Sequence, residues 1–391
     1  MPFTIQAAEG PTFVNREQEL KDILTTLKDP YSTMGFALYG KRRMGKTSIF
    51  RETHRRLLEE KNIVPIYFSI WDLIEKNVKE FARELSVAIV EEYRSHLSLP
   101  HKAKDLLSLP LNFIKNVFSG LKLSVEVQDS LTLVFSLGKE KEIDPGVLID
   151  TVFTLPEKLA KETKKKSVLL IDEFPDIVDI KINGKKLEEA VIKKIRTIQE
   201  GYKYTALNVS GSTRRTMESA VLSSTSAFYR QFIVKEVGPF SKEAVNELMD
   251  KNLVNARLSS KALDSLFDFT AGIPFYVQFL GRLLNKYSVK ILDEQVINKV
   301  IGEFLSQEGD LIFKEEFEKL SEKERLIVIT MAKKDLGSFS HISETLGNQV
   351  TNLGRHLVYL EEKDILYKEE RGLYSFTDPI FKQWLAKKFS E

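Results

Sequence analysis

Eight residues near the start of the chain, GKRRMGKT at Gly40–Thr47, limit its folds more than any other segment does. They fit the pattern G-x-x-x-x-G-K-[ST] at every fixed position. The apolar run Gly35–Gly40 predicts a strand before them, and the basic segment from Thr47 to about Glu60 predicts a helix after them. In this setting glycines let backbone N–H groups surround a phosphate at the helix N-terminus. The segment therefore predicts a phosphate-binding loop in a parallel α/β sheet, because a basic turn in an unrelated fold would lack this strand and this helix.

Each position of the loop has an expected contact with a bound nucleotide. The Lys46 amine would lie on the β- and γ-phosphates, and the Thr47 hydroxyl would be a ligand of a magnesium ion. Lys46 is therefore expected both to bind the nucleotide and to assist catalysis. The residues of this segment that are expected to contact the nucleotide are Gly40, Lys41, Arg42, Arg43, Met44, Gly45, Lys46, Thr47 and Ser48.

Two acidic residues follow a second apolar run further along the chain. The run Ser167–Ile171, SVLLI, predicts a fully buried strand that ends in Asp172 and Glu173. A strand that ends in two acids is common by itself, but with a phosphate-binding loop upstream the pair has a chemical use. Asp172 would hold the magnesium ion together with Thr47, and Glu173 would be catalytic by polarising the attacking water. The second acid favours hydrolysis over the mere holding of a nucleotide.

Polar residues also follow the next predicted strand, Tyr204–Ser210. Adjacent parallel strands end at the same crevice, so these residues would lie beside the γ-phosphate. Ser212 would sense the γ-phosphate or orient water. Arg214 or Arg215 would contact phosphate within its own chain or in a neighbouring subunit, and a solvated basic loop is the equal alternative for each arginine.

The length of 391 residues is sufficient for two or three domains. Strands and helices alternate up to about Pro239, with an inserted β-hairpin predicted near 121–137. The next segment has a helical pattern with no strand evident. It is followed by a helix, a short helix, a helix and a small hairpin, which is the order of a winged helix. The predicted domains are a P-loop core at 1–240, a helical lid at 241–315 and a winged helix at 316–391.

Composition excludes several classes of function. The chain has no cysteine, which excludes disulfides, thiol nucleophiles and thiolate metal sites. Its 58 Lys and Arg residues nearly cancel its 56 Asp and Glu residues, so any contact with nucleic acid must come from a local patch. We find no secretory signal at the N-terminus and no apolar run of about 18 residues. We therefore expect no membrane span and a cytoplasmic protein.

Together these residues resemble the archaeal-type ATPases of the STAND branch, which are relatives of AAA+ proteins and of the Orc/Cdc6 group. The resemblance implies an AAA+/STAND-like P-loop NTPase core, with ATP and Mg²⁺ as ligands. It also implies that Asn15 and Arg16 lie against the adenine and that Pro274 lies where the lid closes over the base. The segments that carry the resemblance span nearly the whole chain: Phe13–Glu17 with Glu19-Leu20, the loop with its Arg42-Arg43 pair, Asp172-Glu173, Gly211-Ser212, Gly272–Pro274, and Tyr374–Pro379 with Trp384.

The winged helix leads to two hypotheses for function. In the first, ATP closes the lid, hydrolysis releases it, and the winged helix couples this switch to double-stranded DNA. In the second, which is a signalling switch of the STAND kind, the winged helix contacts a partner protein or a second copy of the chain. The acidic pair Glu361-Glu362 and a charge-neutral wing leave both hypotheses open. The residues expected to meet DNA lie near the start of the third helix: Asn348, Gln349, Thr351, Asn352, Arg355 and His356.

Overall fold

The computed structural model describes residues 3–96, 144–182, 189–211 and 230–390, together with Lys185–Lys186 and the single residues Met217, Val221 and Phe228. The hairpin predicted near 121–137 lies outside the described residues. The chain divides into two compact units. One is Gln6–Gly238, and the other joins Met1–Ile5 to Pro239–Glu391. The predicted boundaries of three domains, including the separation of a lid from a winged helix at 315/316, stay a prediction.

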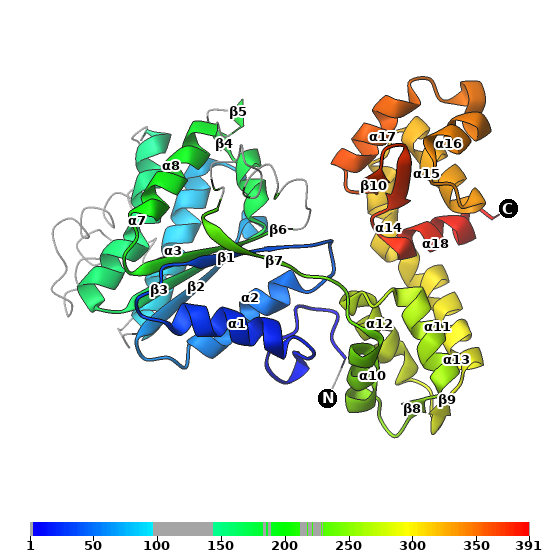
Figure 1. Ribbon diagram of the computed structural model, residues 1–391, viewed down its shortest axis with the longest axis horizontal. Coiled ribbons are helices and arrows are strands. Elements are labelled where there is room, and N and C mark those ends of the chain that lie inside the picture. The colour runs from blue at the N-terminus through cyan, green and yellow to red at the C-terminus, as the bar shows by residue number, and fades with distance from the viewer. Residues whose placement is uncertain are drawn as a thin grey trace. The chain divides into compact units, whose positions relative to one another are not determined.

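A five-stranded sheet forms the centre of the first unit (Figure 1). Each neighbouring pair of strands is parallel, and the strand order is β2-β3-β6-β1-β7. Such an order requires helical crossovers, which cover both faces of the sheet. The predicted parallel-sheet P-loop fold is therefore confirmed. The strands are β1 (Gly35–Tyr39), β2 (Ile63–Ser69), β3 (Lys166–Asp172), β6 (Thr205–Gly211) and β7 (Phe232–Glu236).

Helices lie on both faces of this sheet, which explains why β3 and β6 are buried along their whole length. In Figure 1, α1 and α2 lie on one face, and α3, α7 and α8 lie on the other. The main core lies under the second group, where the Phe81 ring packs 5.8 Å from Phe68 and 6.1 Å from Phe153. The helices are α1 (Glu17–Lys28), α2 (Lys46–Leu57), α3 (Val78–His96), α7 (Pro145–Thr163) and α8 (Glu189–Glu200).

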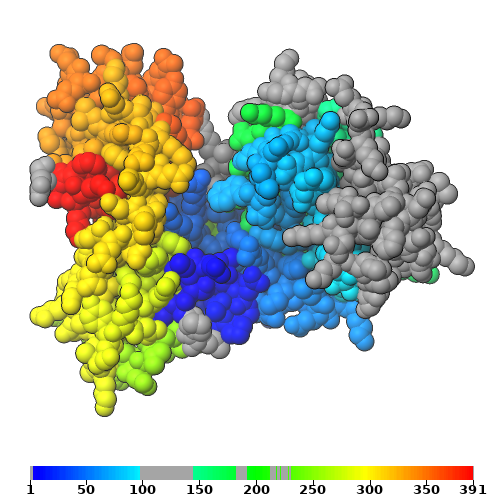
Figure 2. Space-filling model, turned by 180° about the vertical axis from the view of Figure 1, so that it is seen from behind, coloured from blue at the N-terminus to red at the C-terminus, as the bar shows by residue number. Residues whose placement is uncertain are grey.

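Short elements complete the first unit. The segment before α1 lies along α2, because Ala8 N–H donates to the Ser48 hydroxyl at 2.9 Å and Gly10 N–H donates to the Glu52 carboxylate at 2.7 Å. Figure 2 shows dark blue residues of this N-terminal region at the surface, beside lighter blue residues that follow them in the first unit. The short elements are the 3-10 helices Gly10–Thr12, Ile70–Asp72 and Phe174–Asp179 and the strands β4 (Lys181–Ile182) and β5 (Lys185–Lys186).

The second unit begins with helices packed around aromatic side chains. The Phe304 ring lies 5.1 Å from Phe279 and 6.0 Å from Tyr276. Two short parallel strands, β8 (Arg257–Leu258) and β9 (Ile291–Leu292), correct the expectation that this segment has none, since a two-residue strand has no periodicity to read. The helices are α10 (Lys242–Asn252), α11 (Ser260–Thr270), α12 (Pro274–Leu284), α13 (Glu294–Glu303), the π-helix Phe304–Glu308 and α14 (Gly309–Glu318).

The C-terminal part of this unit has the predicted order of helix, short helix, helix and hairpin. Its third helix begins at Leu353, because Asn352 before it has a left-handed backbone with φ 58°. Trp384 of the last helix packs against Phe313 and Phe381, each at 5.7 Å. None of the described helices is long and apolar enough to cross a membrane. The elements are α15 (Glu322–Lys334), α16 (Phe339–Leu346), the 3-10 turn Gly347–Gln349, α17 (Leu353–Glu362), β10 (Leu366–Glu370), β11 (Leu373–Phe376) and α18 (Pro379–Lys388).

Candidate nucleotide-binding site

The loop Gly40–Thr47 lies between the end of β1 and the start of α2, as the sequence predicts. Its backbone requires glycine at the first position, because a Cβ on Gly40 would lie 2.3 Å from the Val237 carbonyl oxygen. Gly45 and Arg43 both have positive φ, at 90° and 68°. Among the described residues, no side chain caps the N-terminus of α2. A glycine turn at a helix start directs backbone N–H groups into the loop, and an anion fits there best.

The side chain of Lys46 lies inside this loop. It is buried, and its Nζ donates to the carbonyl oxygens of Gly40 and Lys41, both at 2.9 Å. The two carbonyls hold the ammonium group on the concave side of the turn. A positive charge in this place fits the phosphate-binding role that the sequence predicts for Lys46.

The carboxylate of Asp172 is the centre of the hydrogen-bond network at the end of β3. It is 2% exposed, and its Oδ2 accepts from the Thr47 hydroxyl at 2.7 Å and from the Tyr67 hydroxyl at 3.0 Å. Its Oδ1 accepts from the Ser210 hydroxyl and from the Glu173 N–H. The structure thus brings together the two predicted metal ligands, Thr47 and Asp172. A hydroxyl and a carboxylate are oxygen donors of the kind that magnesium prefers, so these residues fit the ion.

Glu173 has an unusual backbone and an unusual pKa. Its φ of 53° is in the left-handed region, which a glutamate adopts only when its surroundings require it. The residue is 8% exposed. Burial raises the pKa of its carboxyl from 4.5 to about 7, and the charge of Asp172 acts in the same direction, whereas Lys46 lowers it. A carboxyl group that titrates near neutrality is suited to accept and release a proton.

The predicted adenine box lies beside the loop. Arg16 is buried, and its guanidinium donates to the carbonyl oxygen of Met44 at 3.4 Å and to that of Gly238. Asn15, the residue before it, is half-buried and has a positive φ of 59°. The contacts of Arg16 thus tie α1 to the loop and to the chain that follows β7.

The remaining residues predicted to bind the nucleotide do not all lie in the loop. Ser48 accepts its hydrogen bond from the Ala8 N–H, and the exposed Arg42 extends to Trp71, whose ring centroid lies 5.9 Å from its Cζ. Pro274 begins α12 in the second unit, so its contact with the base stays a prediction. The predicted residues Ser212, Arg214 and Arg215 lie outside the described residues.

Two residues of the network were missed by sequence reasoning. Ser210 is the last but one residue of β6, and its position in a buried strand was a usable signal because a polar residue there needs a partner. Tyr67 lies within β2, where a tyrosine fits ordinary packing. No pattern in the sequence distinguishes it.

Solved structures share this fold. A Walker-type ATPase of Pyrococcus abyssi superposes with a TM-score of 0.66 at 17% identity, covering 98% of this chain and 99% of that chain. The ORC2 protein of Aeropyrum pernix superposes with a TM-score of 0.54 at 12% identity, covering 99% and 98%. At these identities the likeness is one of fold.

Sequence comparisons give the family. Two uncharacterized ATP-binding proteins of Methanocaldococcus jannaschii are similar: one is 21% identical over 75% of this chain and 78% of its own length, the other 22% identical over 85% and 82%. A model of a domain of unknown function matches residues 310–385. The model of the ATPase domain predominantly from Archaea matches residues 13–280, more than half of the chain. The resemblance to archaeal-type ATPases is confirmed, and the chain belongs to this family of predominantly archaeal ATPase domains.

Proposed function

We propose that this protein binds ATP together with Mg²⁺ at the loop and hydrolyses the ATP to ADP and phosphate. The observation that carries the proposal is the 2.7 Å hydrogen bond between the Thr47 hydroxyl and the Asp172 carboxylate at the start of α2. This pair would hold the ion on the side of the loop where Lys46 would meet the phosphates. Bound magnesium would supply positive charge to the phosphate oxygens.

The residues of the chain would then act on the substrate in defined ways. Lys46 would transfer its hydrogen bonds from the loop carbonyls to the β- and γ-phosphate oxygens. Glu173 would accept a proton from the water whose oxygen attacks the γ-phosphorus, while the bond from that phosphorus to the β–γ bridging oxygen breaks. Its pKa of about 7 keeps a useful fraction ionised at neutral pH and gives the carboxylate more basic strength than an ordinary glutamate has. Ser212, Arg214 and Arg215 are proposed to contact the γ-phosphate.

Membership of the family and the names of the relatives support ATP as the nucleotide. The relatives of Methanocaldococcus jannaschii are named ATP-binding proteins. In this proposal the adenine lies near Asn15 and Arg16 on one side and near Pro274 on the other. Residues 241–315 would form a lid over the nucleotide, and residues 316–391 would be a winged helix.

A test of hydrolysis uses the full chain and Glu173→Gln. We expect both proteins to bind ATP with Mg²⁺ and only the unaltered protein to release phosphate. The measurement is phosphate release under steady-state conditions alongside equilibrium binding of a fluorescent ATP analogue. Unchanged phosphate release by Glu173→Gln would remove this residue from the mechanism.

We further propose that the nucleotide switch is coupled to double-stranded DNA. The start of α17 supports this proposal, because Asn348, Gln349 and Thr351 precede it as exposed polar residues. The Lys323 amine lies beside them, donating to the Thr351 hydroxyl at 2.9 Å, and Arg355 is exposed one turn into the helix. Exposed amides with cations beside them are the groups that read base edges and contact phosphates.

The alternative is a switch whose winged helix contacts a protein, either a partner or a second copy of the chain. Binding of a fluorescent duplex by the full chain, with and without ATP, distinguishes the two. DNA coupling predicts binding that weakens with salt and weakens further in a Lys323→Ala, Arg355→Ala double variant, with Lys261→Ala on α11 as a control. Absence of binding at low salt would favour the protein contact.

A further inference from the structure

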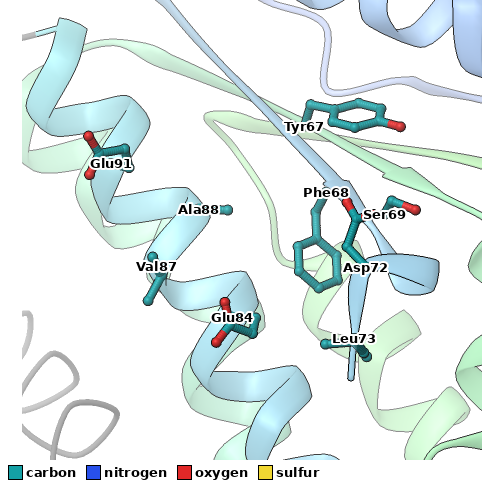
Figure 3. A pocket seen from close by; sticks show the side chains of 9 residues that line it. All are labelled: Tyr67, Phe68, Ser69, Asp72, Leu73, Glu84, Val87, Ala88 and Glu91. Atoms are coloured by element: carbon teal, nitrogen blue, oxygen red, sulfur yellow. The ribbon is translucent and has the colours of Figure 1, made fainter. Parts of the chain in front are cut away.

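The Tyr67 side chain is directed at the metal-ligand side of the sheet. Successive residues of a strand point to opposite faces, and Figure 3 shows Phe68 directed toward α3 while Tyr67 extends away from it. The register of β2 and β3 places Ser69 opposite Asp172, which brings the Tyr67 ring alongside the strand end. The Tyr67 hydroxyl donates to Asp172 Oδ2 at 3.0 Å. Burial and the charge of Asp172 raise the pKa of Tyr67, so the phenol remains a donor throughout the neutral range.

Arg51 packs against the ring of the same tyrosine. It lies one helical turn after Thr47 on α2, so both side chains face the end of β3. Its guanidinium lies over the tyrosine ring, with Cζ 5.5 Å from the ring centroid. Glu9 lies 3.6 Å from the guanidinium and completes the line of contacts. Tyr67 thus has Arg51 against its ring and donates from its hydroxyl to Asp172.

The hydrogen bonds that Asp172 accepts indicate what the Tyr67 contact does. A carboxylate has about four lone-pair positions, and here its two oxygens accept from Thr47, Tyr67, Ser210 and the Glu173 N–H. A metal ion that takes a lone pair of Asp172 Oδ2 would displace one of its two donors, and Thr47, whose oxygen would turn to the ion, would be that donor. The Tyr67 hydroxyl is then the donor that still fixes the direction of this oxygen.

We propose that Tyr67 is a positioning residue that orients the carboxylate of Asp172 for the metal ion, and that Arg51 in turn orients Tyr67. This inference rests on the proposed function, because it assigns a support to a ligand of the proposed magnesium site. Partners of this kind, which touch a ligand and not the ion, typically change metal affinity by about 10- to 100-fold when removed.

The test compares Tyr67→Phe, which removes one oxygen, with a matched control. Tyr202→Phe removes the hydroxyl of a more deeply buried tyrosine, which donates to the Phe153 carbonyl at 2.6 Å and is remote from Asp172. A fluorescent ATP analogue is titrated onto the full chain in EDTA and at a series of Mg²⁺ concentrations. Thermal unfolding of each variant establishes that it is folded.

We expect Tyr67→Phe to bind the analogue in EDTA as the unaltered protein does, but to need about tenfold more Mg²⁺ for the tight complex. Tyr202→Phe should need no more than the unaltered protein. Arg51→Gln, which keeps the phenol, should shift the Mg²⁺ requirement in the same direction by a smaller factor, and it provides the test if Tyr67→Phe does not fold. An unchanged Mg²⁺ requirement in a folded variant would overturn the inference. Failure of the unaltered protein to bind the analogue would instead overturn the proposed function.

Discussion

Replacing Glu173 with glutamine should stabilise the nucleotide-free chain in mildly alkaline solution and leave its stability nearly unchanged in acid. Burial, assisted by the charge of Asp172, raises the pKa of Glu173 from 4.5 to about 7. Between these two values the unfolded chain has lost a proton that the folded chain still binds. The contribution of the protonated carboxyl to stability is therefore complete below about pH 4.5 and is lost as the pH rises through 7.

The size of the effect follows from the difference between the two pKa values. At about 1.4 kcal/mol for each pH unit, the buried carboxylate costs the folded state about 3 kcal/mol above neutrality. A neutral glutamine avoids this cost and fills the same space. For a unit the size of Gln6–Gly238, such a change in free energy raises the melting temperature by about 6 to 12 °C.

Differential scanning calorimetry without nucleotide measures this directly, at about pH 5 and about pH 8. The control is Glu59→Gln, just after the end of α2, whose side chain is 72% exposed and should give no pH-dependent difference. The reasoning about burial would be refuted if Glu173→Gln shifted the melting temperature equally at both pH values, or if it lowered it in alkaline solution.

Two further substitutions test the supports of the loop. Gly40→Ala should destabilise the first unit and abolish ATP binding, because its Cβ would lie 2.3 Å from the Val237 carbonyl oxygen. The control is Gly238→Ala, where a Cβ meets nothing within 4 Å; it should leave thermal unfolding and ATP binding unchanged. Burial alone would raise the pKa of Glu52, but hydrogen bonds from two arginines and the Gly10 N–H outweigh this effect and lower the pKa from 4.5 to about 2. Glu52→Gln should therefore cost about 3 kcal/mol in denaturant unfolding at neutral pH, with the difference disappearing as the pH falls toward 2; an equal cost at both ends would contradict the ionic account.

The sequence predicted those parts of the site in which the chemistry depends on local spacing. The loop needs glycines and a lysine at fixed separations, and Asp172-Glu173 follow directly from a buried apolar run. The contacts of Tyr67 and Ser210 with Asp172 could not be predicted in this way. They depend on which strands are neighbours and in what register. Tyr67 is 105 positions from Asp172 in the sequence and Ser210 is 38 positions from it, and both reach its carboxylate only in the folded sheet.

The order of elements in the fold was also predictable, because helical and strand periodicities differ and change at glycine and proline. The boundaries of the elements were less predictable. For example, α17 begins at Leu353 because Asn352 has a left-handed backbone, and nothing in the composition of that segment indicates this backbone conformation. Similarly, the raised pKa of Glu173 results from its own burial and from the charge of Asp172, which are consequences of the folded chain.

Equilibrium binding of ATP with Mg²⁺ to the full chain and to Lys46→Ala tests the central claim most directly. The amine of Lys46 is held inside the loop by two carbonyl oxygens at 2.9 Å, so its removal takes away the positive charge that would meet the phosphates. Lys79→Ala, on the exposed side of α3, is the matched control. Saturable binding that Lys46→Ala abolishes and Lys79→Ala preserves is the predicted result. Equally tight binding by Lys46→Ala would show that the nucleotide is not held by this loop.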